Sequence, residues 1–311
     1  MLLDMSKDYS NTIGRVTGIY GQRVDVMCGD LVVQAVVRGK LKCVDAAESL
    51  IAVGDFVEVH QRSMDIATIE RILRRGAVIS RPAVENEGVI QVIVANVDRM
   101  VIVASIAQPP LSAGLIDRFL VVAAKAMIHP LIVINKVDLA DVRSIANKIA
   151  AWRRISDEVI CASAHSGEGI DRLRKILEKG TLVVVGHSGV GKSSLLNRIN
   201  PRLNLKIGMI SSSTKRGKHI TSRSNLFKIF PDGWVADTPG LKNLGLVGIT
   251  RKNLHHYFPE FAPFEKDCRF DDCLHIREPN CGIKGALENQ DPAIAEFRYR
   301  DYLSIYDSLD E

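Results

Sequence analysis

The sequence predicts an α/β protein in which a mostly parallel sheet is flanked by a small N-terminal β-barrel and a C-terminal helical segment. Short alternating runs punctuated by glycines fill residues 13–75, and buried-strand runs alternate with helix-length segments from about residue 90. The segment after Leu246 is loop-like and ends in a helical pattern over residues 292–309. A length of 311 residues suits two or three domains.

Composition sets the broad class. A net charge of +5, with 46% hydrophobic and 25% charged residues, is typical of a soluble globular protein. Charged or helix-breaking residues interrupt the longest apolar stretch, residues 119–134, so no membrane span is predicted. The N-terminus is charged and lacks the apolar core of a secretory signal, and we therefore expect a cytoplasmic protein.

The N-terminal region, residues 1–75, reads as several short strands without a long amphipathic helix, which favours an OB-like barrel. An SH3-like barrel or a plain β-sheet packing domain is the alternative. Ten basic and ten acidic residues cancel in this region, so charge alone does not mark it as an RNA binder. The expected strands are residues 15–19, 24–27, 31–38, 56–60 and 67–72.

The middle region contains apolar runs that predict buried parallel strands covered by helices on both faces. In such folds the loops that bind ligands lie at the carboxyl ends of the strands. Motifs are therefore to be sought directly after each run. The runs cover residues 100–104, 131–134, 159–162 and 182–185, with a shorter one at 234–236.

A phosphate-binding loop follows the run at 182–185. Residues 186–193 read GHSGVGKS and lead into a helical segment, which is the strand, loop and helix context that this motif requires. The glycines let backbone amides turn toward the phosphates, the lysine reaches the β and γ oxygens, and the Ser193 hydroxyl can ligate Mg²⁺. The predicted phosphate-site residues are Gly186, His187, Ser188, Gly189, Val190, Gly191, Lys192, Ser193 and Ser194.

The base preference is predicted by an NKVD sequence at residues 135–138, directly after the run at 131–134. The Asp138 carboxylate can accept two hydrogen bonds from the N1–H and 2-amino groups of guanine, a donor pair that adenine lacks. Taken alone, this short motif could instead cap a helix. A companion loop after the run at 159–162 would back the guanine O6 with a backbone N–H. The predicted base-site residues are Asn135, Lys136, Val137, Asp138, Ser163 and Ala164.

Two further segments predict sensing of the γ-phosphate. Asp237 follows the short run at 234–236 and can hold Mg²⁺ through water, and the N–H of Gly240 can contact the γ-phosphate. Thr221 is the candidate for a second hydroxyl on Mg²⁺ beside Ser193. A serine- and threonine-rich surface loop is the alternative interpretation around Thr221.

The order of these motifs is unusual. A Ras-type GTPase runs from the phosphate loop through the switch threonine and DxxG to NKxD, whereas here the base-reading motifs precede the phosphate loop. The cyclic order is preserved, which indicates a circularly permuted P-loop GTPase domain. Leu241 stands where Ras-like enzymes keep a water-orienting glutamine, so slow intrinsic hydrolysis is expected. His219 is the candidate catalytic group, with a solvated or RNA-contacting histidine as the alternative.

A metal site is predicted in the C-terminal segment. Three thiols and one imidazole lie within fourteen residues, a complete tetrahedral set for Zn²⁺ with no position left for water. Such a set favours one structural zinc ion, and a metal-free cluster is the alternative. The predicted ligands are Cys268, Cys273, His275 and Cys281.

With these motifs in place, the sequence resembles the small ribosomal subunit biogenesis GTPases, the RsgA/YjeQ-type family of circularly permuted GTPases. The resemblance covers nearly the whole chain. The family usually has Gly-Arg-His-Thr-Thr in its switch loop, whereas residues 217–221 read Gly-Lys-His-Ile-Thr, and the family's proposed catalytic histidine matches His219. Beyond the nucleotide motifs, the resemblance is carried by FPEF at 258–261, CRFDDCLH at 268–275, EPNC at 278–281 and RYRDY at 298–302.

The resemblance implies an organisation and a function. Residues 1–75 would form an OB-like barrel that binds RNA, residues 76–245 the circularly permuted GTPase domain, and residues 246–311 a zinc-binding helical domain. The implied activity is GTP hydrolysis to GDP with Mg²⁺, stimulated by the small ribosomal subunit during its late maturation and followed by release. The implied partners are that subunit and its rRNA, with the protein monomeric off the ribosome. An RNA-binding scaffold with a structural nucleotide and a GTPase of the large subunit are the alternatives.

The basic charge is concentrated in one segment. Residues 179–231 hold ten lysines or arginines and no acidic residue, whereas the rest of the chain has a net charge of −5. The excess around residues 215–223 is more than one triphosphate needs. A switch loop that contacts rRNA phosphates is therefore expected, with a solvated basic loop as the alternative.

Overall fold

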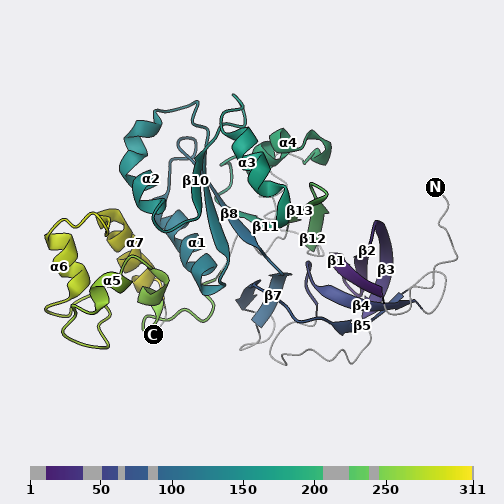
Figure 1. Cartoon of the computed structure of the whole chain (residues 1–311), viewed down its shortest axis with the longest axis horizontal. Coiled ribbons are helices and arrows are strands. Elements are labelled where there is room, and N and C mark those ends of the chain that lie inside the picture. Colours follow the sequence, from purple (N-terminus) through teal and green to yellow (C-terminus); the bar gives the residue numbers. More distant parts are fainter. Residues whose placement is uncertain are drawn as a thin grey trace, which may run out of the picture. The chain divides into compact units, whose positions relative to one another are not determined.

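The computed structural model describes residues 12–37, 51–61, 67–82, 90–205, 224–237 and 245–309 (Figure 1). The chain divides into two compact units, and each is discontinuous in sequence. Residues 1–98, 177–183 and 209–245 form the first unit, and residues 99–176, 184–208 and 246–311 form the second. The predicted boundaries near residues 75 and 245 stay a prediction.

The first unit contains the predicted barrel. Strand β1 pairs with both β2 and β4, and β3 runs parallel to β5, which pairs antiparallel with β4, so five strands close on themselves. This closed five-stranded order confirms the OB-type barrel over the SH3-like alternative. The strands are β1 (Thr12–Tyr20), β2 (Arg23–Cys28), β3 (Leu31–Val37), β4 (Phe56–Gln61) and β5 (Ala67–Ile72).

The interior of the barrel follows from the alternation of its strands. Side chains that point inward along one strand lie two residues apart. Val24 and Val26 of β2 and Val57 and Val59 of β4 are fully buried, with hydrophilic or exposed neighbours between them. This period-two pattern is what made the strands predictable from the sequence.

The first unit also contains strands that the sequence did not predict. Strands β6 (Val78–Pro82) and β7 (Ile90–Ala95) form a separate antiparallel pair. Strand β12 (Ser224–Lys228) pairs antiparallel with both β1 and β13 (Asp232–Asp237). The first five residues of β11 (Lys179–Val185) run parallel to β13.

The second unit is built on three parallel strands, with β9 between β8 and β10. Helices flank this sheet on both sides in Figure 1, which confirms the predicted α/β arrangement. The strands are β8 (Arg99–Ser105), β9 (His129–Asn135) and β10 (Glu158–Cys161), and the helices are α1 (Ala113–Lys125), α2 (Ala146–Trp152), α3 (Ile170–Leu177) and α4 (Lys192–Ile199), with short 3₁₀ turns at Val142–Ile145 and Pro201–Leu203.

The C-terminal segment packs in the second unit. Its aromatic core contains Phe258, Phe261 and Tyr302, and it includes Val121 from α1. The helical pattern predicted from Pro292 gives a shorter helix, because residues 291–294 form a turn in which Asp291 accepts the N–H of Ala293. The elements are the 3₁₀ turn η5 (Leu254–Tyr257), α5 (Ala262–Glu265), α6 (Gly282–Glu288) and α7 (Glu296–Asp307).

A buried charge network joins α7 to α1. Arg298 Nη1 lies 2.7 Å from Asp117 Oδ1, and Arg298 Nε donates to Glu260 at 2.7 Å. The Arg298 guanidinium also stacks on Phe258, and Trp152 donates to Asp117 at 2.9 Å. Buried charges are costly unless they are paired, so removing one member would leave others uncompensated. This network makes α1 and the C-terminal segment parts of one packed unit.

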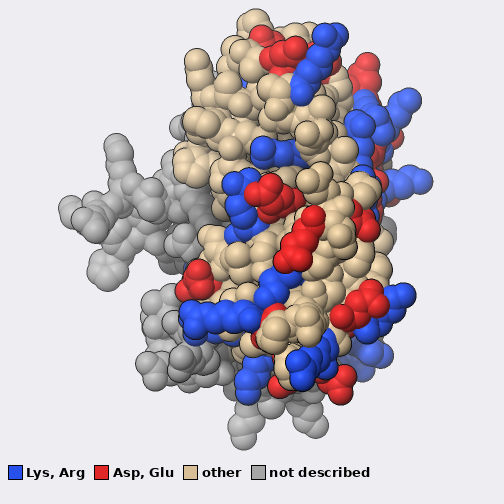
Figure 2. Space-filling view, turned by 90° about the vertical axis from the view of Figure 1, so that its left-hand side faces the viewer, with Lys and Arg blue, Asp and Glu red and all other residues tan. Residues whose placement is uncertain are grey.

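Surface charge is mixed where it can be seen. On the face drawn in Figure 2, lysine and arginine side chains alternate with aspartate and glutamate instead of gathering by sign. The most basic residues predicted from the sequence, around 215–223, lie outside the described residues. Within the described part of the chain, no helix is long and apolar enough to span a membrane.

Candidate nucleotide site and metal centre

The loop over residues 186–191 joins β11 to α4 in the predicted manner. Gly186, Gly189 and Gly191 have φ angles of +139°, +83° and +97°, which residues with a side chain rarely adopt. A Cβ on Gly186 would lie 2.0 Å from the carbonyl oxygen of Val103, and one on Gly191 would lie 2.3 Å from the Asn135 side chain. The glycines are therefore required by both backbone conformation and close packing.

We expect Gly186→Ala to lower stability by about 3 kcal/mol and to weaken guanine-nucleotide binding, because the added methyl clashes with backbone and strains φ. Thermal melting and titration with a fluorescent nucleotide measure both effects. Gly285→Ala is the matched control, since a Cβ there meets nothing within 4 Å in helix α6. Melting of Gly186→Ala at the wild-type temperature would contradict the packing account.

Lys192 and Ser193 begin α4 and are largely buried, at 6% and 5% exposure. The Lys192 ammonium donates to the carbonyl oxygens of Gly186 and His187, each at 2.8 Å, and so lies inside the loop. Gly191 caps the helix without a side-chain hydrogen bond to its first amides. A helix N-terminus whose amides face a loop of this kind is suited to bind phosphate.

Asn135 links three predicted motifs. It ends β9, is 1% exposed, and donates from Nδ2 to the carbonyl oxygen of Val190 at 2.8 Å. Its Oδ1 accepts the N–H of Ala164 at 3.2 Å. Beside it, Lys136 donates from Nζ to the carbonyl oxygen of Gly189 at 2.8 Å. The base-reading loops and the phosphate loop therefore come together at the carboxyl ends of the strands.

Asp138 is held by the companion loop. Ser163 Oγ donates to Asp138 Oδ1 at 2.5 Å and accepts the backbone N–H groups of His165 and Ser166. The hydrogen bond from Ser163 lowers the pKa of Asp138, so this side chain is a carboxylate at neutral pH. An oriented carboxylate is an acceptor for the paired donors of guanine.

The remaining predicted nucleotide residues are not brought into this geometry. Asp237 ends β13 in the first unit. His219, Thr221 and Gly240, together with Leu241, lie outside the described residues.

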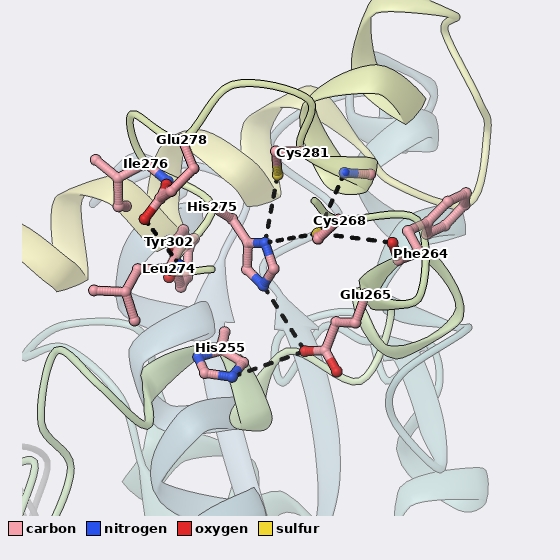
Figure 3. A network of polar contacts seen from close by, with 11 residues as sticks. His255, Phe264, Glu265, Cys268, Leu274, His275, Ile276, Glu278, Cys281 and Tyr302 are labelled. Carbon is pink, nitrogen blue, oxygen red and sulfur yellow. Dashed lines mark hydrogen bonds and ion pairs between the residues drawn. The ribbon is translucent and has the colours of Figure 1, made fainter. Parts of the chain in front are cut away.

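The four predicted metal ligands come together in the C-terminal segment. Their donor atoms all lie within 4.8 Å of one another. His275 Nδ1 is 3.6 Å from Cys268 Sγ and 3.4 Å from Cys281 Sγ, as Figure 3 shows. Cys273, Cys281 and His275 are buried. Three sulfurs and one nitrogen at these spacings match the tetrahedral donor set of structural zinc.

The chemistry of the ligand set fits a bound cation. Burial raises the pKa of Cys273 to about 12 beside two other thiols, and burial lowers the pKa of His275. A cation would reverse the first effect, because a metal binds thiolates and neutral imidazole and displaces their protons. The N–H of Gly282 already points at Cys268 Sγ at 3.3 Å. The residues present therefore fit zinc.

Backbone contacts hold the metal-binding loop in place. Tyr299 and Tyr302 of α7 donate their hydroxyls to the carbonyl oxygens of His275 and Leu274 at 2.7 and 2.6 Å. Although burial opposes ionisation of Glu278, three backbone N–H groups from residues 274–277 bond its carboxylate, and its pKa is lowered. Sequence reasoning did not assign these supports, although RYRDY at 298–302 and EPNC at 278–281 contain them.

A phosphate loop after β11, a guanine-type carboxylate after β9 and a companion serine after β10, in this order along the chain, define a circularly permuted P-loop GTPase. A family model described as RsgA GTPase matches residues 72–247. The chain belongs to the RsgA GTPase family, and it is a GTPase.

Relatives and solved structures agree with this assignment. The chain is 37% identical over 274 residues to "Small ribosomal subunit biogenesis GTPase RsgA" of Chlorobaculum tepidum, covering 85% of this chain and 86% of the relative. The protein of the same name from Thermotoga maritima is 38% identical over 262 residues, covering 83% and 84%.

Two crystal structures share the fold over nearly the full length. YjeQ from Thermotoga maritima superposes with a TM-score of 0.76 at 34% identity, covering 96% of this chain and 98% of that one. YloQ, described as a circularly permuted GTPase, gives 0.71 at 26% identity, covering 99% and 97%. These similarities confirm the permuted fold that the motif order predicts.

Proposed function

We propose that the protein hydrolyses GTP as a late maturation factor of the small ribosomal subunit, binding rRNA, being stimulated by the subunit and leaving after hydrolysis. The observation that carries the proposal is the convergence of Asp138, Ser163 and Asn135 with the phosphate loop. The names of the relatives supply the ribosomal context. The protein would act in the cytoplasm as a monomer until it binds the subunit.

In this proposal each described residue has a distinct task. The Asp138 carboxylate, fixed by Ser163, reads the N1–H and 2-amino groups of guanine. Asn135 fixes the distance between the base loop and the phosphate loop through Val190. The Lys192 ammonium exchanges its two carbonyl partners for β- and γ-phosphate oxygens when GTP enters. These tasks bind and orient the nucleotide.

Magnesium and the reacting water involve residues from several segments. Mg²⁺, when bound, neutralises charge that develops on the phosphates. Ser193 and Thr221 would hold it by their hydroxyls, and Asp237 through water, while Gly240 would contact the γ-phosphate. Because Leu241 has no group to orient water, we assign that task to His219, acting when the subunit is bound.

The two flanking modules would serve docking. The OB-type barrel within residues 1–75 is proposed to contact rRNA, as barrels of this class bind oligonucleotides. Residues 246–311, with one zinc ion, would form a second contact module. The basic residues at 215–223 would add phosphate contacts, so binding should weaken as salt is raised.

Ser193→Ala is expected to reduce Mg²⁺-dependent GTP hydrolysis by at least about 100-fold, because the phosphate loop loses its metal-binding hydroxyl. Single-turnover hydrolysis across a Mg²⁺ titration measures this. Ser156→Ala is the control, since that hydroxyl only donates to the Trp152 carbonyl oxygen in a loop after α2. Wild-type Mg²⁺ dependence in Ser193→Ala would remove Ser193 from the metal site.

Cosedimentation with separated ribosomal subunits tests the choice of partner. With a non-hydrolysable GTP analogue, the protein is expected to pellet with small subunits, and with GDP it should stay in the supernatant. Pelleting with large subunits would support the alternative GTPase role there. Equal binding with both nucleotides would support a scaffold whose nucleotide is structural.

A further inference from the structure

A carboxylate lies beside the outer nitrogen of the histidine ligand. The His275 ring presents Nδ1 to the sulfurs of Cys268 and Cys281, while its Nε2 points the other way, toward Glu265 (Figure 3). Glu265 Oε1 is 3.9 Å from that Nε2. The ring orientation therefore assigns Nδ1 to the metal and leaves Nε2 facing an acidic group.

This outer nitrogen needs an acceptor. A neutral imidazole that binds a cation through Nδ1 carries its proton on Nε2. His275 is only 2% exposed, and its Nε2 is buried with no hydrogen-bond partner among the described residues. The aromatic rings that pack against it, from His255 and Phe261, meet it edge to face. Glu265 is thus the acidic group placed to take the proton's hydrogen bond.

Glu265 is itself flanked by a second imidazole. Its Oε1 lies 4.0 Å from His255 Nε2, in the 3₁₀ turn η5. The two histidine rings pack with centroids 5.3 Å apart. Glu265 ends α5, directly after the buried Phe261, so its backbone is anchored in the aromatic core. The carboxylate is therefore placed between His275 and His255 by packed elements on both sides.

We propose that Glu265 is a positioning residue of the zinc centre, which accepts the Nε2–H of His275, with His255 holding the carboxylate from its other side. Hydrogen bonds of this kind fix the tautomer and orientation of a ligating histidine and raise its basicity. Loss of such a partner typically weakens metal affinity by about 10- to 100-fold. Glu265 would therefore tune how tightly the C-terminal segment holds its ion.

A competing use of the same carboxylate is a second metal ion. His255, His256 and Glu265 also offer three donor atoms within 4.8 Å of one another. In that case Glu265 would be a ligand and the protein would bind two ions. The His275 ring argues against this, because its buried Nε2 would then be left without an acceptor. The number of ions bound per chain separates the two uses.

The test measures zinc affinity of the full-length protein by competition with a chromophoric chelator. Glu265→Leu is expected to bind zinc about 10- to 100-fold more weakly than wild type, and Glu265→Gln, whose amide oxygen still accepts, less than 10-fold more weakly. Both should still bind one zinc per chain at saturation. Glu288→Leu, an exposed glutamate at the end of α6, is the matched control and should match wild type.

A second readout follows the ring proton itself. In ¹⁵N-labelled, zinc-loaded protein, His275 should show a protonated Nε2 that exchanges slowly with water, and exchange should accelerate in Glu265→Leu but remain slow in Glu265→Gln. A merely structural glutamate would not change this signal. Zinc affinity of Glu265→Leu within twofold of wild type would overturn the proposal. Two zinc ions per wild-type chain, falling to one in His256→Ala, would also overturn it.

Discussion

Asp138→Asn is expected to shift nucleotide preference from GTP to xanthosine triphosphate. The wild-type carboxylate can accept from both the N1–H and the 2-amino group of guanine, whereas an asparagine presents one acceptor and one amide donor. Xanthine has a carbonyl at C2, which needs that donor. The substitution preserves the local structure, because the asparagine Oδ1 can still accept from Ser163.

The expected change is large because both lost contacts are charge-assisted. Hydrogen bonds to a charged group each contribute about 1.5–3 kcal/mol, so GTP affinity should fall by about 100-fold or more while affinity for the xanthine nucleotide rises. Competition binding with the two nucleotides measures both changes. Asp141→Asn is the control, since Asp141 caps the 3₁₀ turn that follows and its amide can still accept from Arg143. Unchanged GTP selectivity in Asp138→Asn would refute the base-reading assignment.

Cys273→Ala is expected to release zinc and to unfold the C-terminal segment more than the nucleotide-binding core. The thiol is 5% exposed, and the loop that contains it is packed between α6 and α7. Binding of structural zinc contributes directly to folding free energy. A loss of several kcal/mol should lower the melting temperature of the affected segment by about 10 °C or more.

Metal content, melting and limited proteolysis together test this expectation. Cys161→Ala in β10 is the matched control, because that cysteine lies apart from the metal-binding cluster. Nucleotide binding should survive in Cys273→Ala, since Asp138, Asn135 and the phosphate loop lie in other elements. One zinc per chain in the variant, or unchanged melting after zinc loss, would contradict the structural role.

The nucleotide site was predictable because its chemistry is local in sequence. Each of its described motifs directly follows an apolar strand, and parallel strands place their carboxyl ends at one edge. The sequence did not predict that the Asn135 side chain joins all three loops. That contact depends on the close approach of Gly191, which no residue pattern specifies.

Other features depend on contacts between distant parts of the sequence. Strands β6, β7 and β12 are short and lack a clear alternation, so only their pairing partners identify them. Arg298 is buried because Asp117 and Glu260 meet it, although an arginine is ordinarily an exposed residue. The zinc ligands were predictable from their spacing, but the orientation of His275 toward Glu265 required coordinates.

Stimulation of GTP hydrolysis by purified small subunits tests the central claim most directly. The protein alone is expected to hydrolyse GTP slowly, because Leu241 cannot orient water, and small subunits should raise its turnover rate by at least about 100-fold. Large subunits and free tRNA should leave the slow rate unchanged. An equal, slow rate with and without small subunits would contradict the account and favour an RNA-binding scaffold with a structural nucleotide.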